Sequence, residues 1–152
     1  MGKTAEYDDG YATCESTYAT LRIYHQDLDP DSVSALLGLQ PTRSFARTQT
    51  ASGYRSKHGA WFLSTEEYAT SRDVRRHVDW ILAQLEGKHN VLHTMQQSGY
   101  RMDIFCYWVS KSGHGGPMLS PSTMRQLADA NLPIGFDVYF YDGANNDLEG
   151  NE

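Results

Sequence analysis

A glycine-rich loop around one histidine is the stretch of this sequence best suited to chemistry. The loop reads Ser112-Gly-His-Gly-Gly-Pro117. Its glycines let backbone N–H groups approach a ligand closely and adopt positive φ, a geometry that builds anion-binding nests. His114 would then act as a hydrogen-bond donor or a general acid–base. One hypothesis is an anion site formed by Ser112, Gly113, His114, Gly115 and Gly116. The alternative is a tight turn whose histidine packs on an aromatic neighbour such as Trp108.

A basic segment supplies a second candidate. No acidic residue occurs within residues 34–64. The same interval holds four cationic side chains and a His-Gly pair, namely Arg43, Arg47, Arg55, Lys57 and His58. Arginine recognises phosphate and carboxylate groups through bidentate hydrogen bonds. His58, Arg43 and Arg55 would extend the site for a small anionic ligand if the fold brings them to His114. Otherwise the segment is a solvated loop.

Other histidines match metal-binding patterns only in part. His25 precedes Asp27 and Asp29, but Asp29 stands before a proline and is better explained as a helix cap. His89 and His93 have the four-residue spacing that can bind zinc on a helix, without a clear third ligand. The sequence also lacks the recognised hydrolase, zinc-protease, Cys-x-x-Cys and Walker motifs. We therefore expect no metal, no cofactor and a binding protein rather than an enzyme.

Alternating apolar residues predict three strands, a run that is apolar on both faces predicts another at 59–64, and helix-start signals predict the helices between them. The strands lie over residues 14–25, 59–64, 100–109 and 134–141. Asp-Pro and Ser-Pro pairs start short helices at residues 30 and 121. One helical phase of apolar residues spans 72–98, and Gly87 interrupts it. A continuous helix is the favoured interpretation, and a helix pair broken at Gly87 is the alternative.

These elements predict one α+β domain over residues 13–141. We expect a single mixed or antiparallel four-stranded sheet with helices packed on one face. A strand, a cap, a short helix and a second strand occur in both halves, which suggests a ferredoxin-like pseudo-repeat of split β-α-β units. A long polar connection over 39–58 is typical of functional or flexible loops. The direction of the third strand decides whether the histidines at positions 25, 58 and 114 converge.

The composition fits a single globular domain. The chain has 152 residues, enough for one hydrophobic core. Its formal charge of −6 resides in the termini, with −2 in residues 1–12 and −4 in residues 142–152. We expect both termini to be disordered tails around a neutral domain. The neutral domain and its short basic segment disfavour nucleic acid as a partner.

Two further features suggest where the protein works. No apolar run approaches the roughly 20 residues that span a bilayer, and the first residues contain no apolar signal region. We therefore expect a cytoplasmic protein without a membrane partner. Cys14 and Cys106 are the only cysteines and both lie in strand patterns. In a reducing cytosol they are expected to be buried free thiols.

Several short motifs carry a family resemblance. They are Leu21-Arg-Ile-Tyr24, Asp29-Pro30, Leu36-Leu-Gly-Leu-Gln-Pro-Thr42, His58-Gly-Ala-Trp61, Asp79-Trp80 and Ser112-Gly-His-Gly-Gly-Pro117. In these motifs and their spacing, residues 15–141 resemble a bacterial family of small proteins known only as a domain of unknown function. The resemblance implies no assigned activity, so it transfers no catalytic role. By analogy of size, proteins of this kind include immunity proteins that block a partner toxin.

We therefore expect a non-enzymatic binding or interaction module with a protein partner, of which an immunity-like protein is one form. The alternative is a small protein or enzyme that handles an anionic ligand with the Gly-His-Gly-Gly loop.

Overall fold

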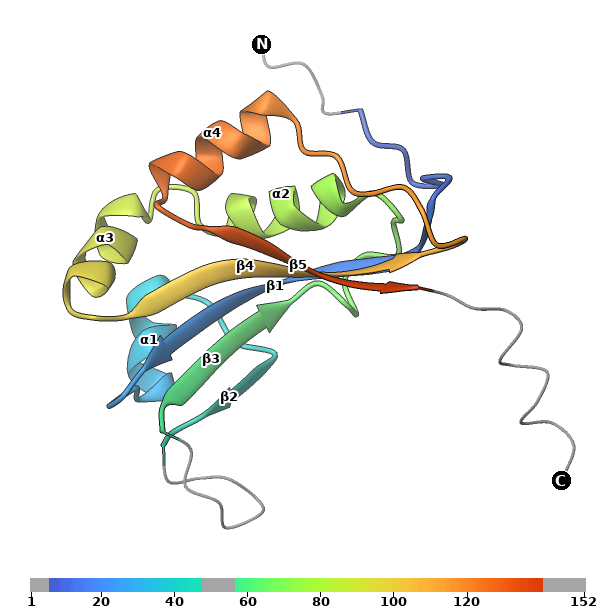
Figure 1. Ribbon diagram of the computed structural model, residues 1–152. Coiled ribbons are helices and arrows are strands. Elements are labelled where there is room, and N and C mark those ends of the chain that lie inside the picture. The colour runs from blue at the N-terminus through green and yellow to red at the C-terminus, as the bar shows by residue number, and fades with distance from the viewer. Residues whose placement is uncertain (1–5, 48–56, 141–152) are drawn as a thin grey trace, which may run out of the picture.

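The computed structural model describes residues 6–47 and 57–140. Within these ranges the chain forms five strands and four helices (Figure 1). In chain order they are β1 (Cys14–His25), α1 (Pro30–Leu37), β2 (Arg43–Phe45), β3 (Gly59–Ser64), α2 (Val74–Gln84), α3 (His89–Gln97), β4 (Arg101–Ser110), α4 (Pro121–Asp129) and β5 (Ile134–Phe140). This content confirms the α+β class. Arg55 and the acidic stretch 142–152 lie outside the described residues.

The five strands form one mixed sheet in the order β2-β3-β1-β4-β5. Strand β1 lies at the centre and pairs antiparallel with both of its neighbours, which places Leu21 opposite Leu63 of β3 and Ile104 of β4. Strand β5 pairs in parallel with β4. Parallel neighbours need a crossover connection, and α4 supplies it.

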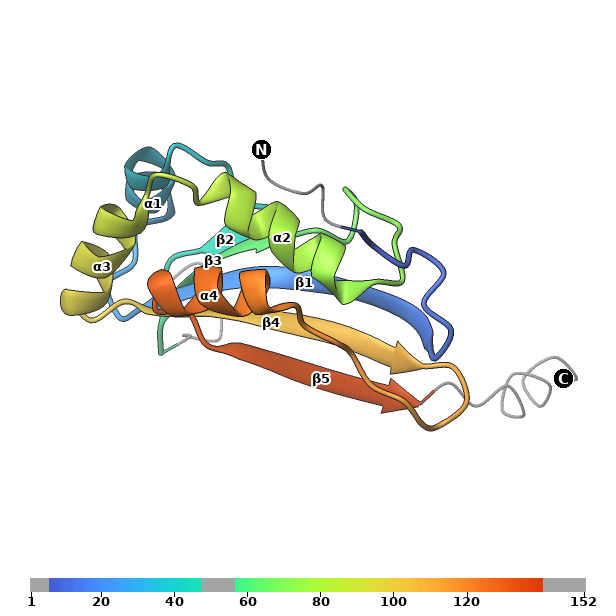
Figure 2. The same ribbon diagram turned by 90° about the horizontal axis from the view of Figure 1, so that it is seen from above.

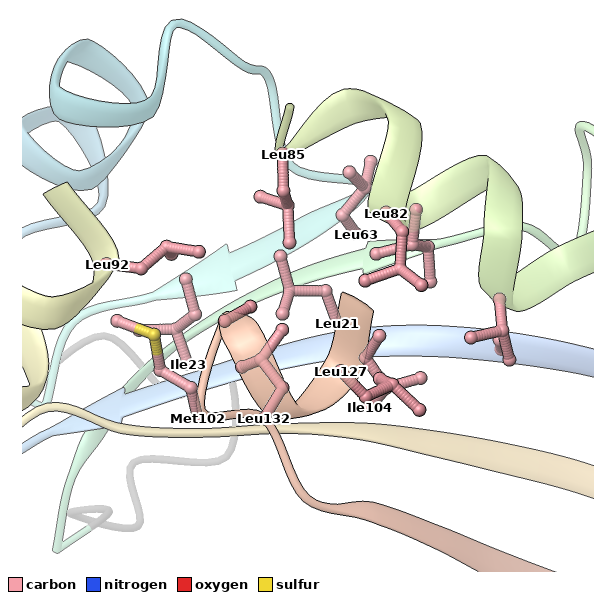
Figure 3. Packing of buried hydrophobic residues seen from close by; sticks show 14 of the residues in the cluster. Leu21, Ile23, Leu63, Leu82, Leu85, Leu92, Met102, Ile104, Leu127 and Leu132 are labelled. Atoms are coloured by element: carbon pink, nitrogen blue, oxygen red, sulfur yellow. The ribbon is translucent and has the colours of Figure 1, made fainter. Parts of the chain in front are cut away.

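All four helices lie on one face of the sheet (Figure 2). Successive side chains of a strand point to opposite faces, so one set on each strand meets the helices. On β1 that set is Ala19, Leu21 and Ile23, each fully buried. They pack in one core with leucines of the helices, such as Leu82 of α2 and Leu92 of α3 (Figure 3). No helix in the described part of the chain is both long enough and apolar enough to cross a membrane.

Residues 72–98 form two helices, so the favoured continuous helix is wrong. Helix α2 ends at Gln84 and helix α3 begins at His89. Between them Gly87 has a φ of +76°, a left-handed conformation that cannot continue a right-handed helix. The helical spacing of apolar residues continues across the break because Leu85 and Leu92, on either side of it, pack in the same core (Figure 3).

The expected four-stranded sheet also needs correction, because a fifth strand lies at its edge. Strand β2 has three residues and pairs antiparallel with β3. It falls within the connection over 39–58, where the sequence pattern predicts no strand. Three residues are too few to display the period-two alternation by which strands are recognised.

The ferredoxin-like pseudo-repeat is not confirmed. In split β-α-β units the two strands of a unit are parallel and another strand lies between them. Here β1 and β3 are direct neighbours and antiparallel, whereas β4 and β5 are direct neighbours and parallel. Helices α1 and α4 both start with proline, so the similarity of the two halves is confined to local helix-start signals.

Candidate functional site

Hydrogen bonds within the protein hold the glycine-rich loop that follows β4. The hydroxyl of Ser110, the last residue of β4, accepts a bond from the Gly113 N–H (3.0 Å) and donates one to the His114 carbonyl (2.8 Å). The imidazole of His114 is exposed, and its Nδ1 lies 3.0 Å from the Ser112 hydroxyl oxygen. The N–H of Gly113 is therefore occupied by the protein itself.

The segment before β1 packs on this loop. The Tyr11 hydroxyl donates a hydrogen bond of 2.8 Å to the Gly116 carbonyl. Thr13 stands so close to Gly115 that a Cβ at this glycine would lie 2.4 Å from the Thr13 Cβ. Packing against Thr13 thus explains Gly115 without a ligand, which supports the turn interpretation of this position.

The same N-terminal segment reaches helix α2. The Tyr7 hydroxyl donates to the Asp79 carboxylate at 2.7 Å, and burial together with this bond raises the pKa of Tyr7 to about 12. The Asp9 carboxylate accepts from Arg76 at 2.7 Å. A disordered tail over residues 1–12 therefore does not describe residues 6–12, which are tied to the domain.

The strand pairing places the basic segment far from the loop. His58 precedes β3, whose first residue pairs with His25 at the end of β1. The loop follows β4, whose last residue pairs with Cys14 at the start of β1. The 12 residues of β1 span about 36–40 Å. His58 and His114 therefore lie at opposite ends of the sheet, and Arg43 lies on the edge strand β2 away from β4. The two halves of the expected anion site are not brought together.

The other candidate histidines make structural contacts. The His25 ring stacks on Tyr100 with ring centroids 4.3 Å apart. The Nε2 of His93 lies 3.0 Å from the Asp129 carbonyl oxygen and joins α3 to the end of α4. The rings of His89 and His93 are 6.4 Å apart. Across residues 6–47 and 57–140 no group of three or more His, Cys, Asp or Glu side chains is placed to hold a metal ion.

One histidine is fully buried beneath the start of α2. The Nε2 of His77 donates to the Ser71 carbonyl at 2.7 Å, so Nδ1 accepts from the Thr65 hydroxyl at 2.6 Å. Burial lowers the pKa of His77. A neutral imidazole with both nitrogens bonded fixes the connection between β3 and α2, which is a structural role.

The face of the sheet opposite the helices, called here the helix-free face, gathers aromatic side chains. Strand alternation places them opposite the core positions, and they are Tyr18, Tyr24, Phe62, Phe105, Tyr107 and Tyr139. Tyr18 and Tyr107 are stacked with ring centroids 4.9 Å apart, and Tyr139 follows at 5.2 Å from Tyr107. All six are half-buried or exposed, so the rings lie on a surface that the described helices leave open.

An arginine–carboxylate pair lies among these rings. Arg22 of β1 donates to both oxygens of Asp103, its partner on β4, at 2.7 and 2.6 Å. The guanidinium carbon lies 4.0 Å from the centroid of the Phe105 ring. The hydrogen bonds to Asp103 raise the pKa of Arg22, so this cation is held and neutralised within the face.

Two adjoining hollows open on the helix-free face. The larger has a volume of about 330 Å³ and is lined by Tyr18, Phe62, Arg43, Glu66 and Glu67 among others. The smaller has a volume of about 230 Å³ and is lined by Tyr18, Arg22, Phe105, Tyr107 and Asp137 among others. Tyr18 lines both, so the hollows form one trough across the strands.

Three carboxylates that line this trough have no cationic partner among the described residues. None of the ion pairs among the described residues includes Glu66, Glu67 or Asp137. Burial raises the pKa of Tyr18, and the charges of Glu66 and Asp137 raise it further. The trough is thus lined by aromatic rings and has negative charge near Tyr18.

This face is not among the sites expected from the sequence, although β1 carries its pattern. Tyr18, Arg22 and Tyr24 occupy positions that alternate with the core residues of that strand. Alternation predicts the strand but gives no role to the residues between its core positions. Large rings repeated on the outward side are the sign that this side is not ordinary solvent-facing surface.

The chain also matches a known family over most of its length. Residues 15–141 match the family described as a domain of unknown function, DUF4279. This chain belongs to the DUF4279 family. The match confirms the resemblance inferred from the short motifs, and the description of the DUF4279 family states no activity. No curated protein matches the chain. No solved structure matches it either.

Proposed function

We propose that this chain is a non-enzymatic interaction module that binds a partner protein through the helix-free face. The observation that carries the proposal is the open trough lined by aromatic rings around the Arg22–Asp103 pair. Aromatic residues and arginine are enriched at the centres of protein–protein interfaces, where they dominate the binding energy. Rings held on a sheet also lose little conformational freedom on binding.

The polar groups of this face support binding better than catalysis. Arg22 is bound by Asp103, and Asp137 accepts the Tyr139 hydroxyl at 2.8 Å. Because these groups form hydrogen bonds with one another, they are less available to activate a substrate. The carboxylates of Glu66 and Glu67 oppose the phosphates of nucleic acid, which disfavours that partner.

A photo-crosslinking amino acid at two positions tests this proposal. One protein carries it in place of Tyr139 on the helix-free face, and a control carries it in place of Arg125 on the exposed side of α4. We expect one protein, identified by mass spectrometry, to be crosslinked from position 139 and not from position 125. The purified partner should then bind in fixed stoichiometry. Equal crosslinking from both positions, or none, would contradict the proposal. A toxin as the partner would specify the immunity-like form.

The glycine-rich loop gives a second candidate function, the binding of a small anion. Its support is the exposed imidazole of His114 with Nδ1 near Ser112, in the connection that leads to α4, whose start at Ser120 has no side-chain cap. Titration with inorganic phosphate, followed by NMR of the His114 ring, tests it. Saturable shifts at His114 that are absent in Ser112→Ala would support the site. Unchanged spectra would rule out the anion site. They would also rule out a contribution of His58, Arg43 or Arg55 to that site.

A further inference from the structure

We infer that the helix-free face receives an arginine or lysine side chain of the partner, seated on the Tyr18–Tyr107 ring pair between Glu66 and Asp137. This inference rests on the proposed function and names the chemistry of the partner at the same site. Three features of the trough lead to it: the stacked rings, the carboxylates on either side of them, and the neutralisation of Arg22 by Asp103.

The stacked rings provide the seat. Tyr18 of β1 and Tyr107 of β4 are cross-strand partners, and their planes are inclined by only 21°. The stacked rings face each other, and Tyr139 lies on the far side of Tyr107, so the outer π face of Tyr18 is the one that borders the larger hollow. A guanidinium or ammonium group over such a surface is attracted by the ring quadrupole, and arginine also stacks on it through its own plane.

Carboxylates stand on both sides of this seat. Asp137 is the partner of Tyr107 on the neighbouring strand β5, and Glu66 follows β3 on the other side of β1. The charges of both act on the Tyr18 hydroxyl, so a cation near that hydroxyl would be attracted from two sides. An anion at the same place would be repelled from both.

The cations of the face do not already fill this role. Arg22 lines the smaller hollow, and both oxygens of Asp103 hold it over the Phe105 ring. Arg43 lines the larger hollow together with Glu66 and Glu67, but it forms no ion pair with any described carboxylate. One unpaired arginine against these acids leaves the trough negative. Its volume of about 330 Å³ on this side accommodates a long basic side chain.

Small probes test the inference without the partner. The isotope-labelled full chain is titrated with acetyl-arginine amide, acetyl-lysine amide and the neutral isostere acetyl-citrulline amide, followed by amide NMR shifts. We expect saturable shifts at Tyr18, Tyr107 and Glu66 with the two cations, weakened by added salt, and none with citrulline. Binding on the order of millimolar is the range for a single side chain.

Charge variants locate the site. Asp137→Asn and the double variant Glu66→Gln with Glu67→Gln should each weaken binding of the arginine probe about threefold or more. Arg43→Gln is the matched control, because removing a cation from the same hollow should leave binding unchanged or strengthen it. Circular dichroism melting checks that each variant is folded.

The outcomes separate this inference from the proposed function. Shifts that are equal for citrulline and arginine, or that survive the carboxylate variants, would overturn the basic side chain as the occupant. If position 139 still crosslinks one partner, the interaction module stands and its partner has other chemistry. If the crosslinked species is a second copy of this chain and no cation binds, the interaction module likewise stands, and the basic side chain is overturned as its occupant.

Discussion

Thr13 fills the space into which a side chain on Gly115 would project. A Cβ at Gly115 would lie 2.4 Å from the Thr13 Cβ, and the glycine has a φ of +87°. Two neighbours separate these effects, because Gly113 has a φ of +84° with nothing within 4 Å of its Cβ position, and Gly116 has open space without a positive φ. Gly113 and Gly116 therefore serve as controls for the effects of positive φ and of crowding at Gly115.

Alanine at each of these glycines should therefore destabilise the protein to a different extent. We expect Gly116→Ala to change the free energy of unfolding by less than about 0.5 kcal/mol. Gly113→Ala should cost about 1–2 kcal/mol from left-handed strain. Gly115→Ala should cost about 2–4 kcal/mol, because a clash with Thr13 is added to the same strain. Urea unfolding measures all three, and equal losses at Gly113 and Gly115 would show that Thr13 does not crowd the loop.

The Arg22–Asp103 pair should couple measurably, since it is bidentate and less than a third exposed on either side. A double-mutant cycle with Arg22→Gln and Asp103→Asn should give an interaction energy of about 1 kcal/mol in thermal or urea unfolding. The exposed Arg76–Asp9 pair is the control and should give a smaller coupling that salt removes more easily. Arg76 also lies over an aromatic ring, that of Tyr7, so the two pairs differ mainly in exposure, and identical coupling would contradict the expected effect of partial burial.

Protonation of His77 should destabilise the fold. Burial depresses its pKa in the folded state, so the unfolded chain binds the proton more tightly. The stabilising contribution is therefore complete above the unfolded pKa of about 6.5 and is lost as pH falls through the lower, folded pKa. Carboxylates titrate lower, near about 4, so the two effects separate.

The free energy of unfolding between pH 7.5 and pH 5 measures this effect. The wild-type protein should lose stability over that interval. His77→Gln should begin less stable, because a buried hydrogen-bond network is disturbed, but should show a flatter dependence on pH. A variant with the full wild-type slope would show that another group is responsible.

Both cysteines should be unreactive in the folded protein. Burial raises the pKa of Cys14 to about 11 and that of Cys106 to about 12, so neither forms appreciable thiolate at neutral pH. Their strand register separates them by about four residues, or about 13 Å, too far for a disulfide. A thiol reagent at pH 8 should modify neither thiol in buffer and both in concentrated urea. Modification of either thiol at the rate of a free one in buffer would contradict this burial.

The elements that sequence predicts well are those with a strong local pattern. Alternation locates β1, β4 and β5, and an apolar run locates β3, each to within a residue at each end. The Asp29-Pro30 and Ser120-Pro121 pairs mark the starts of α1 and α4. Asp29 does so without its side chain capping the helix backbone, since its carboxylate instead accepts from the Ser32 hydroxyl at 2.6 Å. Proline at the first turn is the stronger of the two signals here.

What sequence does not predict depends on contacts between distant residues. The strand β2 exists because Arg43 and Phe45 pair with β3, not because of their own pattern. Gly87 is compatible with a bent helix or a break, and the core reached by both helices hides which one occurs. The anion-site hypothesis at Gly115 weakens because Thr13, 102 positions earlier, provides the contact. The aromatic trough likewise appears only when four strands are placed side by side.

Because β1 lies at the centre of the sheet, a point substitution and an insertion in this strand should have different consequences. Its odd positions from 17 to 23 are buried, whereas its even positions from 18 to 24 form part of the helix-free face. Substitution at even positions can therefore alter the proposed partner surface while the interior stays intact. A single inserted residue would exchange the two sets and place tyrosine and arginine in the interior. We expect this lineage to diversify its partners by point substitution along β1 and to tolerate no change in the length of that strand.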